Sequence, residues 1–349
     1  MNTHPELEIL SSGAFASIQD GGRYGFRRIG VPWAGVLDRR LMRIANALVD
    51  NLGDAPVIEC FDGGLQLAAH GAGVKLAVAG DAVVEIKGAE QTRPLAPWRS
   101  ITLAEGETLR IRRMGHGRVA VVAIAGLTVP AVMGSASTYL RAGLGGIDGR
   151  ALAAGMRLKL DAADARGSDR VLRQLPDADD GPIRVVPGPQ ADHFSAAALV
   201  ALVGSEYRVS AEADRMGIRL EGARLEHVAA AEIVSDATVP GSIQVPGAGQ
   251  PIVLLADAQT AGGYPKIATV ISADLARLAA LRPGQSLRFA AVSAAEGVGI
   301  ARAAEAETLR VLASIRALPP DGIDLVALYT SNLVGGVVHA LSADYRPLY

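Results

Sequence analysis

Short apolar runs separated by turn residues restrict the fold of this chain more than any other feature. Five of them follow one another at close, regular intervals: Val74–Ala79, Val83–Ile86, Ile101–Leu103, Thr108–Arg112 and Val119–Ile124. Most contain β-branched residues, and Gly, Asp, Pro or Ser stand between them, which is typical of the strands of a barrel or sandwich. We therefore predict a mostly β architecture with some helix (α+β).

Similar runs occur on both sides of this region. Further strands are predicted at Leu7–Leu10, Ala14–Gln19, Ile183–Val186, Tyr207–Val209, Ile218–Leu220, Glu232–Ser235, Ile243–Val245, Ile252–Leu255 and Ile267–Ile271. Helices are expected from Asp38 to Val49, near Asp192–Val203 as a buried helix, near Ser272–Leu281 with Ser272 as N-cap, around 300–315, and at Leu325–Leu341.

The segment Asp161–Gly181 is polar, acidic and contains proline, so a domain boundary is expected there. We predict an N-terminal β-rich domain at 1–180 and a second β-barrel at 181–292. A helical C-terminal extension is expected at 293–349, because apolar residues recur there at roughly helical spacing.

Charge and aromatic content narrow the range of partners. The chain has 34 basic and 36 acidic residues and a net charge of −2, so nothing electrostatic favours nucleic acid or an anionic membrane. Only 4% of the residues are aromatic, which leaves little for base stacking.

Cysteine usage and the N-terminus suggest the compartment. The single Cys60 excludes an intramolecular disulfide and suits a reducing cytosol. Residues 1–8 are polar, with no apolar signal core, and no run of 18 apolar residues occurs. A soluble cytoplasmic protein is expected.

The segment Asp257–Lys266 carries polar groups between two predicted strands. Gly262 and Gly263 permit unusual backbone angles, and Pro265 fixes φ before the next strand. Lys266 is one of only four lysines, and lysine, unlike arginine, is a compact donor whose pKa shifts readily. A tight turn with a solvated lysine is the simpler interpretation; a site at the mouth of a sheet is the alternative.

A second polar region lies near the N-terminus. Three glycines occur in the loop Gln19–Gly25, and Asp38 stands where a helix begins. Taken singly, Asp38 is an N-cap, Asn46 is a satisfied helix side chain, and Arg23 is a loop arginine.

Together these stretches resemble the biotin-dependent carboxyltransferase family, also known as allophanate hydrolase subunit 2 or as the C subunit of 5-oxoprolinase. The matching residues are Ser17, Gln19, Asp20, Gly22, Arg23, Gly25, Gly30–Pro32, Gly35, Asp38, Ala45, Asn46, Asn51, Glu59, Ser135, Ser137, Gly145, Gly146, Arg150, Asp214–Gly217, Gly241–Gly247 and Asp257–Lys266. Ala261 stands where the family usually has a second Thr. The resemblance covers residues 12–292 and implies cyclophilin-like β-barrel domains.

The resemblance also implies a function. A stand-alone member is expected to be the C subunit of an ATP-dependent 5-oxoprolinase, which opens the lactam 5-oxoproline to L-glutamate. Its partners are then the sister B subunit, which is similar to allophanate hydrolase subunit 1, and the A subunit, with ATP supplied in the complex. One alternative is biotin-dependent carboxyl transfer to urea or a related amide; another is a non-catalytic regulatory subunit that binds a kinase-inhibitor-like partner. A homo-oligomer is also possible.

Within this resemblance the candidate site residues take two roles. Catalytic roles are predicted for Lys266, Asp257, Arg215 and Asp38, and substrate binding is predicted for Gln19, Asp20, Arg23, Asn46, Glu59, Gln244, Gln259 and Tyr264. Cations and hydrogen-bond donors would stabilise negative charge on an activated amide, and a carboxylate would orient the N–H or act as a base.

Several common site motifs are missing from the sequence. There is no P-loop, HExxH, GxSxG or biotin-attachment motif, and the six histidines lack ligand spacing, so no metal site is predicted. We therefore expect the isolated chain to be catalytically silent without a partner. We also expect the Gln19–Arg23 and Asp257–Lys266 loops to face one shared cavity.

Overall fold

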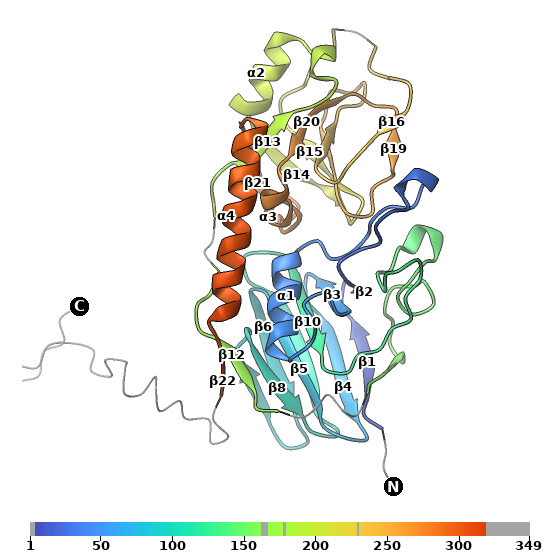
Figure 1. The fold of residues 1–349 in the computed structure, drawn as a ribbon, viewed down its shortest axis with the longest axis vertical. Helices are drawn as coiled ribbons and strands as arrows, with labels where there is room; N and C mark the ends of the chain where they lie inside the picture. Colours follow the sequence, from blue (N-terminus) through green and yellow to red (C-terminus); the bar gives the residue numbers. More distant parts are fainter. Residues whose placement is uncertain (1–3, 162–166, 177–178, 229, 319–349) are drawn as a thin grey trace, which may run out of the picture.

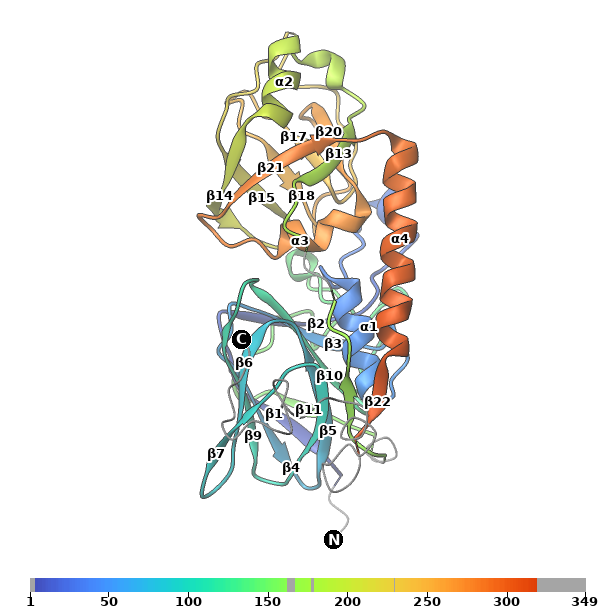
Figure 2. The same cartoon turned by 90° about the vertical axis from the view of Figure 1, so that its left-hand side faces the viewer.

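The computed structural model describes residues 4–161, 167–176, 179–228 and 230–318. Two bodies of strands are stacked along the long axis, and one long helix runs beside both (Figure 1). The same arrangement is visible after a quarter turn about the vertical axis (Figure 2). The predicted mostly β class is confirmed.

The lower body contains two sheets. The first has the order β11 (Arg157–Lys159), β1 (Glu6–Ser12), β4 (Leu65–His70), β9 (Thr108–Met114), β6 (Ala82–Lys87) and β7 (Thr92–Leu95). The second has the order β2 (Phe15–Gln19), β3 (Val57–Phe61), β10 (Val119–Ile124), β5 (Val74–Ala79), β8 (Arg99–Leu103), β12 (Arg170–Leu172) and β22 (Ile315–Ala317). Their facing side chains form one core, which includes Leu7, Leu67, Val78 and Val122.

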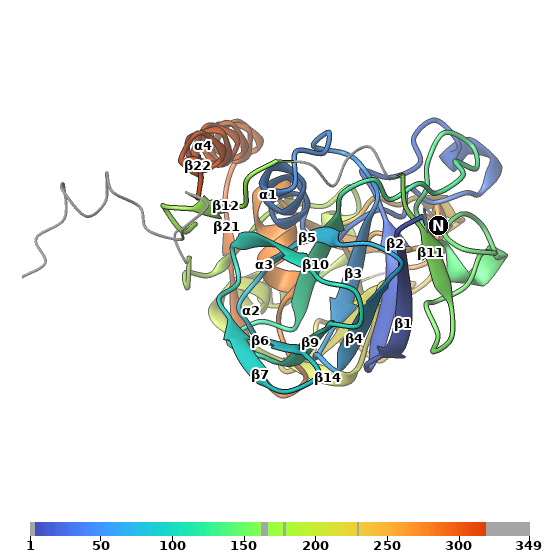
Figure 3. The same cartoon turned by 90° about the horizontal axis from the view of Figure 1, so that it is seen from below.

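The outer face of the second sheet is covered by helices. α1 (Arg39–Leu48) packs Ile44 and Leu48 onto Ala77 of β5 and Val121 of β10. Seen from below, α1 and α4 (Ala294–Ala313) lie outside the strands on the same side (Figure 3). Because β5 and β10 are covered on both faces, they are buried along their whole length, and apart from Lys75 of β5 their residues are apolar rather than alternating.

The upper body is a closed barrel. Its strands are β13 (Ile183–Pro187), β20 (Lys266–Val270), β17 (Ser242–Gln244), β18 (Ile252–Leu254), β15 (Gly217–Glu221), β14 (Glu206–Ala213) and β21 (Ser286–Ala291). Parallel pairing of β13 with β21 closes it. Tyr207, Ile243 and Phe289 are part of its core. A separate two-stranded ribbon joins β16 (Asp236–Ala237) to β19 (Ala261–Gly262).

The remaining described helices are short. They are α2 (Ala196–Gly204), α3 (Leu275–Ala279) and the 3-10 turns η1 (Arg27–Ile29), η2 (Leu140–Ala142), η3 (Ala191–His193) and η4 (Ser272–Asp274). Within the described residues, no helix is both long and apolar enough to cross a membrane.

Some local predictions are wrong. Glu232–Ser235 forms no strand; these residues are mostly exposed, and the neighbouring strand is the two-residue β16. α2 is not a buried helix, since Val200 is 69% exposed and few of its residues reach the core. Ser272 does not cap a helix, because η4 begins with it and α3 starts only after Asp274.

The segment after 293 includes a strand as well as a helix. β22 pairs antiparallel with β12, so the described chain returns to the lower body after α4. The helix predicted at Leu325–Leu341 lies outside the described residues. The division into 1–180, 181–292 and 293–349 stays a prediction.

Candidate functional site

Arg215 joins the two bodies of strands. Its Nε and Nη2 donate to the two carboxylate oxygens of Asp257, each over 3.0 Å, while Nη1 pairs with Glu59 of β3. Nη2 also donates to the carbonyl of Gly35 over 2.5 Å. Because Arg215 and Asp257 belong to the barrel, and Glu59 and Gly35 to the lower body, this guanidinium links the two.

The electrostatics of this cluster follow from its burial. Arg215 and Asp257 are each 5% exposed and Glu59 is fully buried. Burial raises the pKa of Glu59, and the nearby Arg215 opposes that shift without cancelling it. Burial alone would lower the pKa of Arg215, but Asp257 and Glu59 outweigh it and the pKa is raised. Arg215 therefore stays charged between two carboxyl groups.

The loop that contains Gly35 lies between the barrel and the Gln19–Arg23 loop. Ala34 N–H donates to Ala256 of the barrel over 3.1 Å, and Val36 N–H donates to Asp20. A Cβ on Gly35 would lie 2.9 Å from the Cα of Gly22, so only glycine permits this approach. The two polar stretches recognised in the sequence therefore meet through a third loop.

Asp20 organises the Gln19–Arg23 loop internally. Its carboxylate accepts from the hydroxyls of Ser135 and Ser137 and from the N–H groups of Gly22 and Ala136. Both serines belong to the Gly-Ser stretch noted in the sequence. Asp20 thus folds two loops together, and its predicted role in substrate binding stays a prediction.

Arg23 and Gln19 keep unused polar atoms inside the protein. Arg23 donates through Nε to Val132 O over 2.9 Å and through Nη2 to Ser137 O over 2.9 Å, but its buried Nη1 has no hydrogen-bond partner. Burial lowers the pKa of Arg23, against the opposing charges of Asp20 and Asp257. The Nε2 of Gln19 is bonded, whereas its Oε1 is not.

Asp38 and Asn46 have the structural roles that the sequence indicates for each residue taken singly, an N-cap and a hydrogen-bonded helix side chain. Asp38 caps α1 by accepting from Leu41 N–H over 3.0 Å. Asn46 donates to Ala55 O over 2.9 Å and accepts from the amide of Asn51. Burial raises the pKa of Asp38, since the two N–H bonds at the helix start only partly offset the loss of water.

Lys266 is not in the loop where the sequence places it. It is the first residue of β20 and is 2% exposed, so the simpler interpretation, a solvated loop lysine, is wrong. Its Nζ forms an ion pair with Asp236 over 3.0 Å. A Cβ on Gly188 would lie 2.1 Å from the carbonyl oxygen of Lys266, so a glycine lets β13 approach β20 here.

Two glutamines lie close to the strand that Lys266 begins. Gln259 donates to the Oε1 of Gln244 over 3.2 Å, and Gln244 donates to the carbonyl of Tyr264 over 3.4 Å. A Cβ on Gly262 would lie 2.5 Å from the Nε2 of Gln244, so the loop passes directly over this amide. The side chain of Tyr264 is 39% exposed at the surface.

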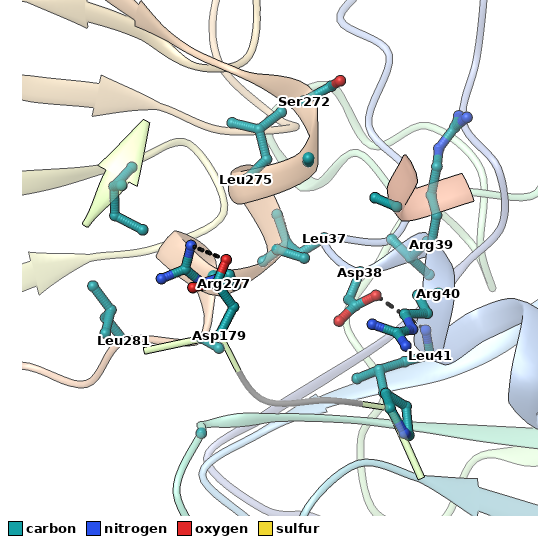
Figure 4. Close-up of a pocket in the computed structure, with 18 of the residues that line it drawn as sticks. Leu37, Asp38, Arg39, Arg40, Leu41, Asp179, Ser272, Leu275, Arg277 and Leu281 are labelled. Atoms are coloured by element: carbon teal, nitrogen blue, oxygen red, sulfur yellow. Dashed lines mark hydrogen bonds and ion pairs between the residues drawn. The ribbon is translucent and has the colours of Figure 1, made fainter. Parts of the chain in front are cut away.

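A large open cavity of about 2090 Å³ lies between the lower body, the barrel and α4. Figure 4 shows Asp38 and Arg40 at the start of α1 on one side and the Arg277–Asp179 ion pair on the other. Gly21 and Ala256 line it, but neither Arg23 nor Lys266 does. This cavity is not the shared one expected, which stays a prediction. In the described parts of the chain, no three His, Cys, Asp or Glu side chains come together as a metal site.

The structure adds two residues that the sequence did not suggest. Gln190 donates to Asp236 over 3.0 Å and accepts from the N–H of Lys266 over 3.2 Å. The turn Pro187-Gly-Pro-Gln190 after a predicted strand was the available signal for Gln190. Asp236 had none, because no glycine or proline stands next to it to mark a turn.

Comparisons with known proteins agree on one family. The model described as carboxyltransferase domain, subdomain A and B, matches residues 29–291. The chain is 38% identical to the C subunit of 5-oxoprolinase from Escherichia coli over 306 residues, which is 84% of this chain and 93% of the relative. The corresponding protein of Haemophilus influenzae is 37% identical, over 85% and 94% of the two chains.

The chain is also similar to one part of larger proteins. Urea amidolyase of Lachancea kluyveri is 28% identical over 82% of this chain but only 17% of its own length. The solved structure of Kluyveromyces lactis urea carboxylase has a TM-score of 0.81 and 25% identity, and the match covers 92% of this chain and 30% of that one.

Proposed function

Because the chain belongs to the family of carboxyltransferase domains with subdomains A and B, we propose that it is the C subunit of a 5-oxoprolinase. In that role it takes part in opening 5-oxoproline to L-glutamate at the expense of ATP, in the cytoplasm. Its partners are the sister B subunit, which resembles allophanate hydrolase subunit 1, and the A subunit.

One observation carries this proposal. Both 5-oxoprolinase relatives match over almost their whole length, 93% and 94%, whereas the urea amidolyase match covers 17% of a much longer protein. The match therefore extends over nearly the whole of the separate subunit but over only a small part of the fused enzyme.

The site geometry is compatible with stabilising negative charge on an amide. Lys266 supplies a buried ammonium at the start of β20, Gln244 is its partner in the β17–β20 pairing, and the amide of Gln259 donates to Gln244. Charge stabilisation by preorganised donors is strongest where water is excluded. Arg215 makes four hydrogen bonds, to Asp257, Glu59 and Gly35, so in this arrangement it positions the two bodies of strands. Direct catalytic roles for Arg215, Asp257 and Asp38 remain part of the proposal.

The nucleotide is proposed to be held by the partner subunits. Phosphates bind readily at helix N-termini, but those of α1, α2 and α4 are capped by the side chains of Asp38, Ser195 and Ser293. These capped N-termini do not fit a phosphate cradle.

The test is reconstitution. We expect the purified chain alone to release no glutamate from 5-oxoproline and ATP, and the chain mixed with its candidate A and B subunits to do so. Omitting each component in turn gives the controls. Turnover by this chain alone, at a rate that no partner improves, would contradict the proposal that activity requires the partner subunits.

A second candidate is carboxyl transfer from carboxybiotin to urea or a related amide. The 92% coverage of this chain by the urea carboxylase match favours it as the alternative. The same mixture, supplied with a biotin carboxylase, a biotinylated carrier protein, bicarbonate and urea, distinguishes the two: urea-dependent ATP consumption that requires this chain, without glutamate release, supports carboxyl transfer.

A further inference from the structure

An exposed carboxylate covers a buried ammonium at the edge of the barrel. The side chain of Lys266 is 2% exposed, whereas that of Asp236 is 49% exposed, and the Nζ and Oδ2 atoms are 3.0 Å apart. Asp236 therefore lies between the ammonium and solvent. An ion pair that serves only to stabilise the surface contributes little, so the burial of the lysine needs another reason.

The ammonium has donors to spare. A protonated lysine carries three N–H groups. The Nζ of Lys266 is close enough to Asp236 for an ion pair. The angle between the two groups is too poor for a hydrogen bond, and Nζ has no other hydrogen-bond partner among the described residues. The short distance accounts for the attraction between the two charges, and the poor angle leaves the donor hydrogens without a well-aligned acceptor. Lys266 is thus attracted to an anion without being saturated by it.

Gln190 provides a second donor at the same point. Its Nε2 donates to the same Oδ2 of Asp236 over 3.0 Å. The glutamine is held in place, since its Oε1 accepts from Lys266 N–H and its own N–H donates to Lys266 O. Nζ and Nε2 therefore converge on one carboxylate oxygen from two preorganised side chains.

The element that brings Asp236 to this position is not part of the barrel sheet. β16 is a two-residue strand, and its ladder partner is the equally short β19. Figure 1 shows this ribbon at the outer edge of the barrel, beside the loop of the lower body that contains η1. The next residues are tied there, as Arg27 donates to Thr238 O over 2.5 Å. A carboxylate on such a short ribbon can leave without unfolding the barrel.

We propose that Lys266 Nζ and Gln190 Nε2 form a subsite for a carboxylate, which Asp236 occupies in the free chain and vacates when the carboxylate of a ligand binds. The ligand class is a small molecule that carries a carboxylate next to its amide. No covalent step is involved. The identity of that molecule as 5-oxoproline rests on the proposed function, but the two donors and the internal competitor do not.

Binding to the full-length chain tests the subsite without requiring turnover. Calorimetric titrations would compare 5-oxoproline with 2-pyrrolidinone, the same lactam without the carboxylate, and with inorganic phosphate. The variants are Asp236→Asn, Gln190→Leu and, as a charge-matched control two residues from Gln190, Asp192→Asn, whose side chain is exposed.

Removal of the Asp236 carboxylate, which competes with the ligand for the subsite, should strengthen binding. We expect Asp236→Asn to bind 5-oxoproline about tenfold more tightly and Gln190→Leu about tenfold more weakly, with no change for Asp192→Asn, in line with the loss or gain of one charge-assisted contact. The affinity for 2-pyrrolidinone should be the same in all four proteins.

Three results would overturn the proposal. They are unchanged or weaker binding in Asp236→Asn, an equal effect on 2-pyrrolidinone, and tighter binding of phosphate than of 5-oxoproline. Carboxylate binding that follows the expected pattern in a complex without 5-oxoprolinase activity would refute the proposed function and leave the subsite standing.

Discussion

At the scale of single residues, the burial of Lys266 changes the interpretation of the segment Asp257–Lys266. A lysine in a glycine-rich loop is expected to be solvated, yet here it starts β20 and reaches into the barrel. Lys266, and after it Gln190, lowers the pKa of Asp236, because both favour the ionised carboxylate. A charged group in such a place is a strong candidate for function.

We predict that Lys266→Met removes activity and leaves the fold intact. Methionine keeps the unbranched chain that packs in the barrel but lacks the ammonium. The loss of one preorganised donor should lower kcat/KM of the reconstituted complex about 100-fold or more. Circular dichroism checks the fold.

Lys87→Met is the matched control, because Lys87 is exposed on β6 and should leave kcat/KM unchanged. Near-normal activity of Lys266→Met would favour the non-catalytic regulatory role instead.

At the scale of elements, Asp274 of η4 anchors β13. It is fully buried and accepts from the backbone N–H of Arg184 over 2.7 Å and from its Nε over 2.8 Å. The Nη2 of Arg184 also donates to Asp274 over 2.5 Å, and Arg277 donates over 3.3 Å. Burial alone would raise the pKa of Asp274, but these bonds outweigh it and the pKa is lowered.

The lowered pKa gives a pH dependence with a definite sign. The ionised form is favoured in the folded state, so the contribution of Asp274 is complete above its unfolded pKa, about 3.9. It is lost as the pH falls through the lower folded-state pKa. We predict that Asp274→Asn lowers the free energy of unfolding at pH 7 by about 2–4 kcal/mol.

Urea unfolding between pH 7 and pH 2 measures both effects. The loss of stability towards low pH should be shallower in Asp274→Asn than in the wild type. Glu226→Gln, at an exposed position, serves as the control. An identical acid slope in wild type and Asp274→Asn would contradict the assignment.

The helix α4 depends on its apolar contact with the lower body. Val311 is fully buried against the cluster formed by α1, β5 and β10, while Val298 on the same helix is 51% exposed. We expect Val311→Ala to lower the free energy of unfolding by about 1–3 kcal/mol, because burial is lost and a cavity remains. Val298→Ala should stay within about 0.5 kcal/mol in the same urea titration.

At the scale of the whole molecule, Arg215 is the main buried link between the two bodies of strands. Its removal would leave Glu59 and Asp257 buried without their cation. Breaking a buried ion pair from one side costs about 3–5 kcal/mol. We predict a loss of this size for Arg215→Met, measured by denaturant unfolding.

A combined variant tests whether the unpaired carboxylates cause this loss of stability. If the cost comes from the uncompensated carboxylates, Arg215→Met combined with Glu59→Gln and Asp257→Asn should recover part of the stability, because those charges are gone. A loss below about 1 kcal/mol in Arg215→Met would instead mean that water or the backbone replaces the guanidinium.

Local patterns determined most of the framework. Short, mostly apolar runs predicted strands β5 and β10 to the residue, since strands covered on both faces need few polar positions; Lys75 of β5 is the one exception in these two strands. Asp38 was predicted to start a helix, because its side chain meets the local need of the free N–H groups. The family, too, was recognisable from the ordered motifs, since these are read directly from the order of residues along the chain.

Contacts between distant residues were decided only by the tertiary structure. Nothing local indicates that Glu59 and Arg215 meet, because their pairing depends on how the two bodies of strands stack. The burial of Lys266, its cover by Asp236 and its neighbour Gln190 arise where three separate segments converge at the edge of a closed barrel. Sequence determined which elements form, because their causes lie within a few residues; the tertiary structure decided which polar groups share a site, because that depends on closing the chain in space.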